Sequence, residues 1–254
     1  MSEHVKVVLE DGVMEITLDR PDKKNALSQA MYAAMNEAMD RLDADDAARV
    51  ALFRSSGPDF TAGNDIADFA AAAASGRPPL AGVFIQKLAA ARKPLVAAVP
   101  GVAVGLGTTM LLHCDLVFVA EDARLSTPFV GLGLTPEAAS SILLPARIGH
   151  ARAFEMFVLG EALSGAEAAR LGVANRALPA ERLDEAAREA CRRIARLPRG
   201  AVAATKALMR DSDALLERIG RESAIFGERL MSAEAREAFA AFMERRPPDF
   251  SKLG

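Results

Sequence analysis

The feature that most constrains the fold is an apolar run, Leu95–Val99, in which no residue is polar. A strand with one face in water alternates apolar and polar residues, so this run predicts a strand that is buried on both faces. Strands of that kind occur in sheets that are covered by helices on both sides. The sequence therefore predicts an α/β fold.

Other β-rich segments surround this run. Residues 5–9 and Val13–Leu18 flank Asp11-Gly12, a pair that favours a tight hairpin turn. Further short apolar runs predict two more buried strands, at 50–53 and Leu116–Ala120. The N-terminal part of the chain thus combines strands with intervening helical patterns.

Helical periodicity begins after Ser28, a favoured N-cap residue. Four apolar residues then recur on one helical face: Met31, Met35, Met39 and Leu42. A second helix is predicted over 80–91. Between the two helices, an alanine-rich stretch over 67–74 leads into Ser75-Gly76-Arg77-Pro78-Pro79, which predicts an irregular segment.

The second half of the chain is predicted to be almost entirely helical. The expected helices cover 136–146, 151–159, Gly165–Leu171, 183–196, 202–209, 214–231 and 233–245. Their apolar faces exceed what one small sheet can cover, which indicates packing against another subunit. We divide the chain into a core at 1–195 and a C-terminal helical region at 196–254, with no clear linker between them.

Composition and charge exclude several classes of protein. The formal net charge of −3 argues against nucleic acid as the main partner, because phosphate neutralisation needs clustered Lys and Arg. Cys114 and Cys191 form no metal-ligand pattern, so no metal is expected. No signal peptide or membrane span is expected, which favours a cytoplasmic protein. Ser251-Lys252-Leu253 resembles a peroxisomal address that must be C-terminal, but Gly254 follows it, so we interpret the match as chance.

Two glycine-containing turns carry the first indication of chemistry. One spans 60–66 and contains Gly63; the other spans 100–109, contains Gly105 and Gly107, and opens into a helix. Glycine lets a backbone approach a ligand closely, and amides at a helix start favour negative charge. Two such turns could direct two N–H donors at one oxygen and form an oxyanion hole. The alternative is that these glycines only make turns.

An ordered set of motifs resembles the crotonase (enoyl-CoA hydratase/isomerase) superfamily over nearly the whole chain. The matching segments are 20–27 (Arg-Pro-Asp-Lys-Lys-Asn-Ala-Leu), 60–66, 93–107, 114–116 (Cys-Asp-Leu) and 163–168 (Leu-Ser-Gly-Ala-Glu-Ala). The resemblance implies a spiral of ββα units with a C-terminal helical trimerisation region, hence a homotrimer or a dimer of trimers. It also implies an acyl-CoA thioester substrate and no separate cofactor.

The resemblance assigns roles to particular residues. The amides of Asn64 and Leu106 are expected to form the oxyanion hole for the thioester carbonyl. A segment of five residues is expected to line the coenzyme A channel: Ala62, Gly63, Asn64, Asp65 and Ile66. Lys24 is a candidate for the phosphates of coenzyme A. Asp65 itself is expected to be structural and to bond amides of its own turn.

Departures from the hydratase pattern reduce the number of reactions that the chain is expected to catalyse. Hydratases of this superfamily use two glutamates, and the corresponding positions here hold Thr109 and Phe129, neither of which moves protons near neutral pH. Two-carboxylate water addition is therefore expected to fail. The segment at 127–141 resembles the peroxisomal-type Δ3,Δ2-enoyl-CoA isomerases, whose base sits on the helix after a glycine-rich loop; Glu137 matches that base. Asn64-Asp65 also resembles that branch.

The surroundings of Glu137 bear on its role. It is the only ionisable side chain from Phe129 to Leu144, so partial desolvation should raise its pKa toward that of a useful base. The alternative is a surface glutamate in a helix first turn, where Pro136-Glu137 would be favoured. The hypothesis is a Δ3,Δ2-enoyl-CoA isomerase. The alternatives are an enoyl-CoA hydratase or another acyl-CoA reaction of the superfamily, and a non-catalytic coenzyme A binder.

Overall fold

A computed structural model of the chain describes residues 2–68, 79–251 and 253. Its main sheet has six strands in the order β1-β2-β3-β4-β6-β9. Only the β1–β2 pair is antiparallel, and the other pairs are parallel. The strands are β1 (Val5–Glu10), β2 (Val13–Leu18), β3 (Val50–Ser55), β4 (Leu95–Val99), β6 (Leu116–Ala120) and β9 (Arg176–Leu178).

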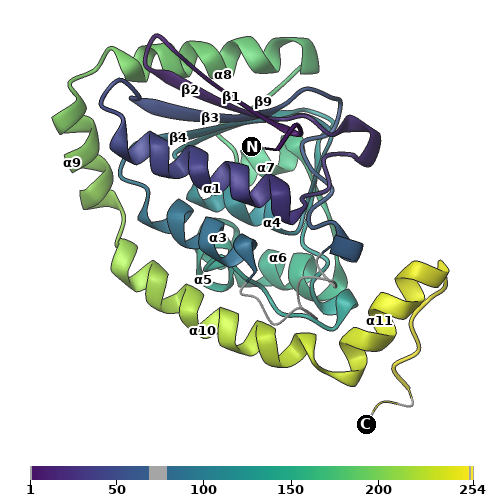
Figure 1. The fold of residues 1–254 in the computed structure, drawn as a ribbon. Helices are drawn as coiled ribbons and strands as arrows, with labels where there is room; N and C mark the ends of the chain where they lie inside the picture. Colours follow the sequence, from purple (N-terminus) through teal and green to yellow (C-terminus); the bar gives the residue numbers. More distant parts are fainter. Residues whose placement is uncertain (1, 69–78, 252, 254) are drawn as a thin grey trace.

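Helices cover both faces of this sheet, as the apolar run at β4 requires. Every residue of β4 is buried, which confirms the prediction from its sequence. Helix α8 (Ala180–Ala195) packs on one face against β2, β3, β4 and β6, while α1 (Gln29–Ala44) and α3 (Leu80–Ala90) lie on the other side (Figure 1). The predicted α/β class is therefore confirmed.

Local sequence signals explain the N-terminal elements. Asp11 and Gly12 both have positive φ in the β1–β2 turn, which confirms the hairpin. The Ser28 hydroxyl accepts a hydrogen bond from the Met31 amide at 3.3 Å and caps α1. All four apolar residues on the predicted helical face are buried: Met31, Met35, Met39 and Leu42.

A second, three-stranded sheet was missed by sequence analysis. It has the order β5-β7-β8 and contains β5 (Val102–Val104), β7 (Arg124–Ser126) and β8 (Leu163–Ser164). Strands of two or three residues are too short to show an alternating pattern. Strand β5 lies within the second glycine turn, so that turn is extended before it enters α4 (Leu106–Thr109) and a 3-10 turn at Met110–His113.

The C-terminal half is mostly helical, as expected, with two differences besides its short strands. Predicted helix 151–159 divides into α6 (His150–Phe154) and a π-helical turn at Glu155–Leu159. Predicted helix 136–146 begins only at Ser140. The remaining helices are α5 (Ser140–Ile148), α7 (Gly165–Leu171), α9 (Arg199–Met209), α10 (Ser212–Leu230) and α11 (Ala233–Glu244).

Helix α10 runs along α3, and α11 follows it at the edge of the molecule beside residues 130–132 (Figure 1). This path brings the end of the chain back to the segment that carries Glu137. Most of the alanine-rich and Pro-containing segment, over 69–78, lies outside the described residues, as do Lys252 and Gly254 of the C-terminal motif. No helix in the described parts of the chain is long and apolar enough to cross a membrane.

Candidate active site

Backbone hydrogen bonds hold the two glycine turns against each other. The Thr61 amide donates to the Val102 carbonyl at 3.0 Å, and the Val104 amide donates to the Thr61 carbonyl at 3.0 Å. A Cβ atom on Gly63 would lie 2.8 Å from the Val104 oxygen, so only glycine permits this approach. Thr61 and Ala103, which are 42 positions apart in the sequence, thus pair across this wall.

Each turn presents one backbone amide to a shared cavity. Leu106 is the first residue of α4, where an amide has no partner inside the helix. The amides on both sides of Asn64 are used, because Gly63 donates to Thr61 Oγ1 and Asp65 donates to the Leu27 carbonyl. Within the described residues, neither the Asn64 nor the Leu106 amide donates to a protein acceptor. Both residues line the same cavity, and together the amides can stabilise a developing oxyanion.

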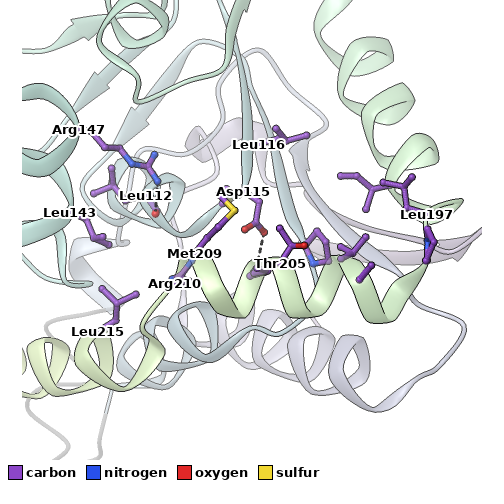
Figure 2. Close-up of a pocket in the computed structure, with 17 residues that line it drawn as sticks. Leu112, Asp115, Leu116, Leu143, Arg147, Leu197, Thr205, Met209, Arg210 and Leu215 are labelled. Atoms are coloured by element: carbon purple, nitrogen blue, oxygen red, sulfur yellow. Dashed lines mark hydrogen bonds and ion pairs between the residues drawn. The ribbon is translucent and has the colours of Figure 1, made fainter.

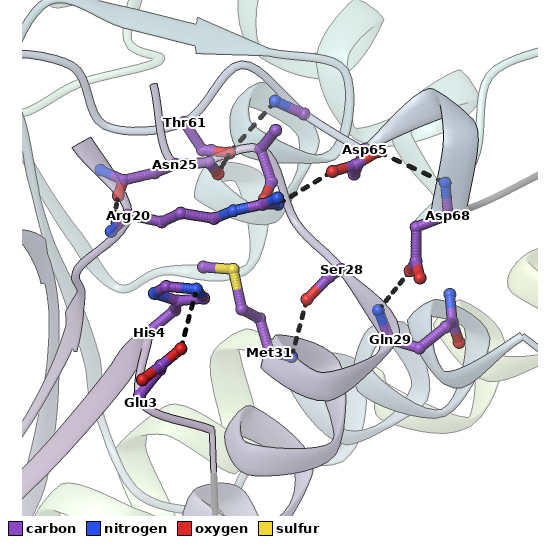
Figure 3. A network of polar contacts seen from close by, with 12 residues as sticks. Glu3, His4, Arg20, Asn25, Ser28, Gln29, Met31, Thr61, Asp65 and Asp68 are labelled. Atoms are coloured by element: carbon purple, nitrogen blue, oxygen red, sulfur yellow. Dashed lines mark hydrogen bonds and ion pairs between the residues drawn. The ribbon is translucent and has the colours of Figure 1, made fainter. Parts of the chain in front are cut away.

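Polar contacts fix the turn that carries Asn64. Figure 3 shows Arg20 reaching Asp65, whose other oxygen accepts from the Asp68 amide. The Arg20–Asp65 distance is 2.9 Å, and Asp68 in turn accepts from the Gln29 amide at 2.6 Å. Burial opposes ionisation of Asp65, but the hydrogen bonds from Arg20 and from the turn amides hold its pKa below the usual value. The structural role predicted for Asp65 is confirmed.

Tyr32, on helix α1, supports the same turn. Its hydroxyl donates a hydrogen bond to Asn64 Oδ1, and its ring is fully buried against Phe84. Burial, assisted by the charge of Glu137, raises the pKa of Tyr32 well above its usual value, so the phenol keeps its proton. Sequence analysis missed this residue because it lies between apolar positions of α1 and carries no motif.

Glu137 lies in the same cavity as the two amides, which has a volume of about 790 Å³. The Thr109 hydroxyl donates a hydrogen bond to Glu137 Oε1. Burial raises the pKa of Glu137 to about 8; the Thr109 bond opposes this shift and the charge of Glu222 adds to it. Glu137 is half-buried and faces the cavity, not bulk solvent, which confirms the predicted partial desolvation.

One feature of the Glu137 prediction was wrong. Glu137 is not in a helix, because Ala138 and Ala139 follow it with φ values of 60° and 53°, in the left-handed region. Helix α5 starts after them, at Ser140. The start was misplaced because Pro136-Glu137 is a favourable first-turn sequence and nothing local signals left-handed alanines.

Apolar side chains form the rest of the cavity wall. Phe129, at one of the hydratase glutamate positions, lines the cavity and packs near Phe157 with ring centroids 6.4 Å apart. The C-terminal helices add four large apolar residues, namely Phe226, Phe239, Phe242 and Met243. The cavity thus draws on both predicted regions of the chain, and its wall suits an apolar acyl group.

The channel residues predicted from the resemblance meet at this cavity, with one exception. Ala62, Gly63, Asn64, Asp65 and Ile66 all line it. Lys24 is not among its described lining residues; the Lys24 ammonium is exposed and lies 3.8 Å from an Asp59 oxygen. Arg20 and Lys23 supply the positive charge at this cavity. Phosphate binding by Lys24 stays a prediction.

A second cavity, of about 680 Å³, lies between α9 and the core and is drawn in Figure 2. The only carboxylate among its described lining residues is Asp115. Asp115 Oδ2 accepts from the Leu95 amide and from the Lys206 ammonium, both at 2.7 Å, so it is held by structural partners. The matching Cys-Asp-Leu motif is therefore explained by folding, and the Glu137 cavity is the candidate active site.

Two further side chains near the site are structural. Cys114 is buried. His113 is also buried and bonds the Ala138 carbonyl through Nε2 at 2.7 Å. Within the described residues, no group of three or more His, Cys, Asp or Glu side chains could hold a metal ion. The expectation that no metal is needed stays a prediction.

Removing the Thr109 hydroxyl should shift the pH dependence of any reaction that uses Glu137 as a base. Activity should fall below pH 8, since the raised pKa protonates Glu137 there. In Thr109→Val the carboxylate loses a stabilising donor, so the acid limb of kcat/KM should move to higher pH, by about one unit. Thr109→Ser keeps the hydroxyl and should retain the wild-type profile. An unchanged profile in Thr109→Val would contradict the contact.

Comparisons with known proteins agree with this geometry. The profile of the family described as enoyl-CoA hydratase/isomerase matches residues 9–252. A probable enoyl-CoA hydratase of Rhodobacter capsulatus is 34% identical over 99% of both chains. The enoyl-CoA delta isomerase 2 of Rattus norvegicus is 31% identical over 97% of this chain and 65% of its own length. The structure of Pseudomonas aeruginosa OdaA has a TM-score of 0.91 and 49% identity, and covers 96% of this chain and 100% of its own.

These similarities define the class to which the fold and the cavity belong. The chain belongs to the enoyl-CoA hydratase/isomerase family, known as the crotonase superfamily, and is an enzyme of that family. The predicted crotonase fold is confirmed by the structural match, which extends over nearly the whole chain. The similar proteins include both hydratases and an isomerase, so the particular reaction rests on the residues of the cavity.

Proposed function

We propose that this enzyme is a Δ3,Δ2-enoyl-CoA isomerase that uses Glu137 as its base. The observation that supports this most is a single available carboxylate beside two oxyanion-binding amides. The other carboxylate that lines the described cavity, Asp65, is held by Arg20. The two positions that carry glutamates in hydratases hold Thr109 and Phe129, so the described cavity lacks the pair of glutamates that would deprotonate a water molecule and protonate C2.

The proposed mechanism is a 1,3-proton transfer. The thioester oxygen of a 3-enoyl-CoA accepts hydrogen bonds from the Asn64 and Leu106 amides. Glu137 removes a proton from C2, and the electron pair of that C–H bond spreads over a dienolate and onto the oxygen. The protonated Glu137 returns the proton to C4, the C2=C3 bond forms and the carbonyl is restored. Proton count and charge are unchanged overall, as an isomerisation requires.

The two parts of the cavity contribute separately to this rate. One oxyanion donor contributes about 10²- to 10³-fold. A positioned general base contributes about 10²- to 10⁴-fold. The raised pKa of Glu137 suits both steps, because a carboxyl group with a pKa of about 8 can accept a proton from C2 and release it to C4 near neutral pH.

The direct test uses the wild-type enzyme with 3-enoyl-CoA substrates of several chain lengths. We expect the absorbance of the conjugated 2-enoyl thioester to appear, and we expect little loss of that absorbance when a 2-enoyl-CoA is supplied with water alone. Rapid hydration without isomerisation would make the enzyme a hydratase. Saturable coenzyme A binding with no thioester turnover would make it a non-catalytic binder. Either result would overturn the proposal.

We further propose that the enzyme works as a homotrimer or a dimer of trimers. Large apolar side chains exposed on this chain support a subunit contact. Leu208 and Met209 at the end of α9 are 90% and 83% exposed, and Leu159 is 68% exposed. Exposed apolar side chains that adjoin one another, as Leu208 and Met209 do in the sequence, favour association. A cytoplasmic location stays a prediction.

A further inference from the structure

The segment that carries Glu137 has an unfavourable backbone, although a local hydrogen bond from the Ser140 amide to the Glu137 carbonyl at 3.0 Å closes the bend. Ala138 and Ala139 both occupy the left-handed region, which L-residues other than glycine, asparagine and aspartate rarely adopt. Such a conformation persists only where surrounding contacts enforce it. In addition, Ala139 is the N-cap of α5 and has no side-chain oxygen to cap the helix. Further support for this segment must therefore come from elsewhere in the chain.

Glu222, on helix α10, supplies that support from 83 residues away. Its Oε2 accepts a hydrogen bond from the Ala139 amide at 2.6 Å. Its Oε1 accepts from the Ser141 amide at 3.1 Å and from the Ser141 hydroxyl. The side chain is only 6% exposed, so these donors are its substitute for water. A carboxylate at this helix start also interacts favourably with the helix dipole.

A second contact holds the Ala138 carbonyl, which belongs to the same peptide group as the Ala139 amide. His113 Nε2 lies 2.7 Å from the Ala138 oxygen, and Arg210 lies against His113 Nδ1. A guanidinium can only donate, so Nδ1 is the acceptor and Nε2 carries the proton given to Ala138. Arg210 also donates to the His113 carbonyl at 2.9 Å, which fixes the pair. The peptide group that joins Ala138 to Ala139 is therefore held at both its carbonyl and its amide.

We propose that Glu222 is a positioning residue of the active site, which holds the Glu137 carboxylate over the substrate by enforcing the left-handed bend at Ala138 and Ala139. The positioning role of Glu222 rests on the proposed function in one respect, that Glu137 is the base of the named reaction. Glu222 does not line the described active-site cavity, so it acts through the backbone. Its negative charge also contributes to the raised pKa of Glu137. The C-terminal helix α10 thus shapes both the place and the basicity of the catalytic group.

The test compares Glu222→Gln with the wild-type enzyme. Glutamine keeps the volume but replaces one of the two oxygens with an NH₂ group, which can only donate, so either the Ala139 or the Ser141 amide would face a donor in place of its acceptor. Displacement of a reacting group by about 1 Å can cost about 10²-fold in rate, so kcat should fall about 10- to 100-fold with KM nearly unchanged. Glu217→Gln removes the same charge from an exposed position of α10 and should behave as wild type.

Two further measurements separate this proposal from the choice of reaction. The first measurement is deuterium incorporation at C2 of a saturated acyl-CoA in D₂O. This exchange requires the base and the oxyanion hole but no double bond. The exchange rate should therefore fall in Glu222→Gln even if the wild type proves not to isomerise 3-enoyl-CoA. A crystal structure of the folded variant should show Glu137 displaced. A wild-type backbone path at 137–141 in the variant would overturn the proposal, and so would a wild-type kcat in a variant whose path has changed.

Discussion

Replacing Glu137 with glutamine should reduce kcat for isomerisation by about 10²- to 10⁴-fold while KM changes by less than about threefold. Glutamine cannot accept the C2 proton, so the general-base contribution is lost. Substrate binding should persist because the oxyanion amides and the apolar wall are untouched. The fold should also persist, since Glu137 with a pKa of about 8 is mostly neutral at pH 7 and glutamine is a neutral side chain of the same size.

The rate at which a 3-enoyl-CoA is converted to the conjugated 2-enoyl-CoA, monitored by absorbance in the variant and in the wild type, measures this effect. Glu121→Gln, at an exposed position, is the matched control and should retain full activity. Thermal unfolding of both variants shows whether a loss of activity reflects the chemistry or the fold. Isomerisation by a folded Glu137→Gln at the wild-type rate would rule out this base.

Replacing Leu106 with proline should remove one oxyanion donor and lower kcat by about 10²- to 10³-fold. Proline has no amide hydrogen and is tolerated at the first position of a helix, which Leu106 occupies. The preceding Gly105 has a φ of 57° and a ψ of −120°, a conformation open to glycine. The backbone can therefore accept the ring while the cavity loses the donor.

Leu106→Ala provides the control for the lost side chain. It keeps the amide but removes the same buried leucine, so both variants should lose stability by about 2–5 kcal/mol. At temperatures where both variants are folded, only the proline variant should show the fall in kcat of about 10²- to 10³-fold. Equal kcat values for the two variants would show that the Leu106 amide does not bind the developing charge.

Most elements of the fold could be predicted because their signals are local. The hairpin at Asp11-Gly12, the cap at Ser28 and the buried strand β4 all depend on residues adjacent in the chain. The strands β7, β8 and β9 could not be predicted in this way, since their two or three residues pair with distant segments and show no pattern of their own.

The candidate site was predicted in part. The two glycine turns, Glu137 and the desolvation around it were visible in the sequence, and all meet at one cavity. Tyr32 and Arg20 were missed as supports of the first turn, and the aromatic wall from α10 and α11 was missed as well. Their side chains resemble those of any helical core or polar surface, so nothing local distinguishes them.

By itself, the sequence determined the α/β class and the positions of the two turns, and it singled out Glu137 as the candidate base, because each follows from neighbouring residues or from a motif. Only the tertiary structure decided that Thr61 pairs with β5 to bring the turns together, that Glu137 precedes its helix, and that Glu222 caps that helix from 83 residues away. These properties arise from hydrogen bonds and burial between distant segments. Such contacts exist only once the chain has folded.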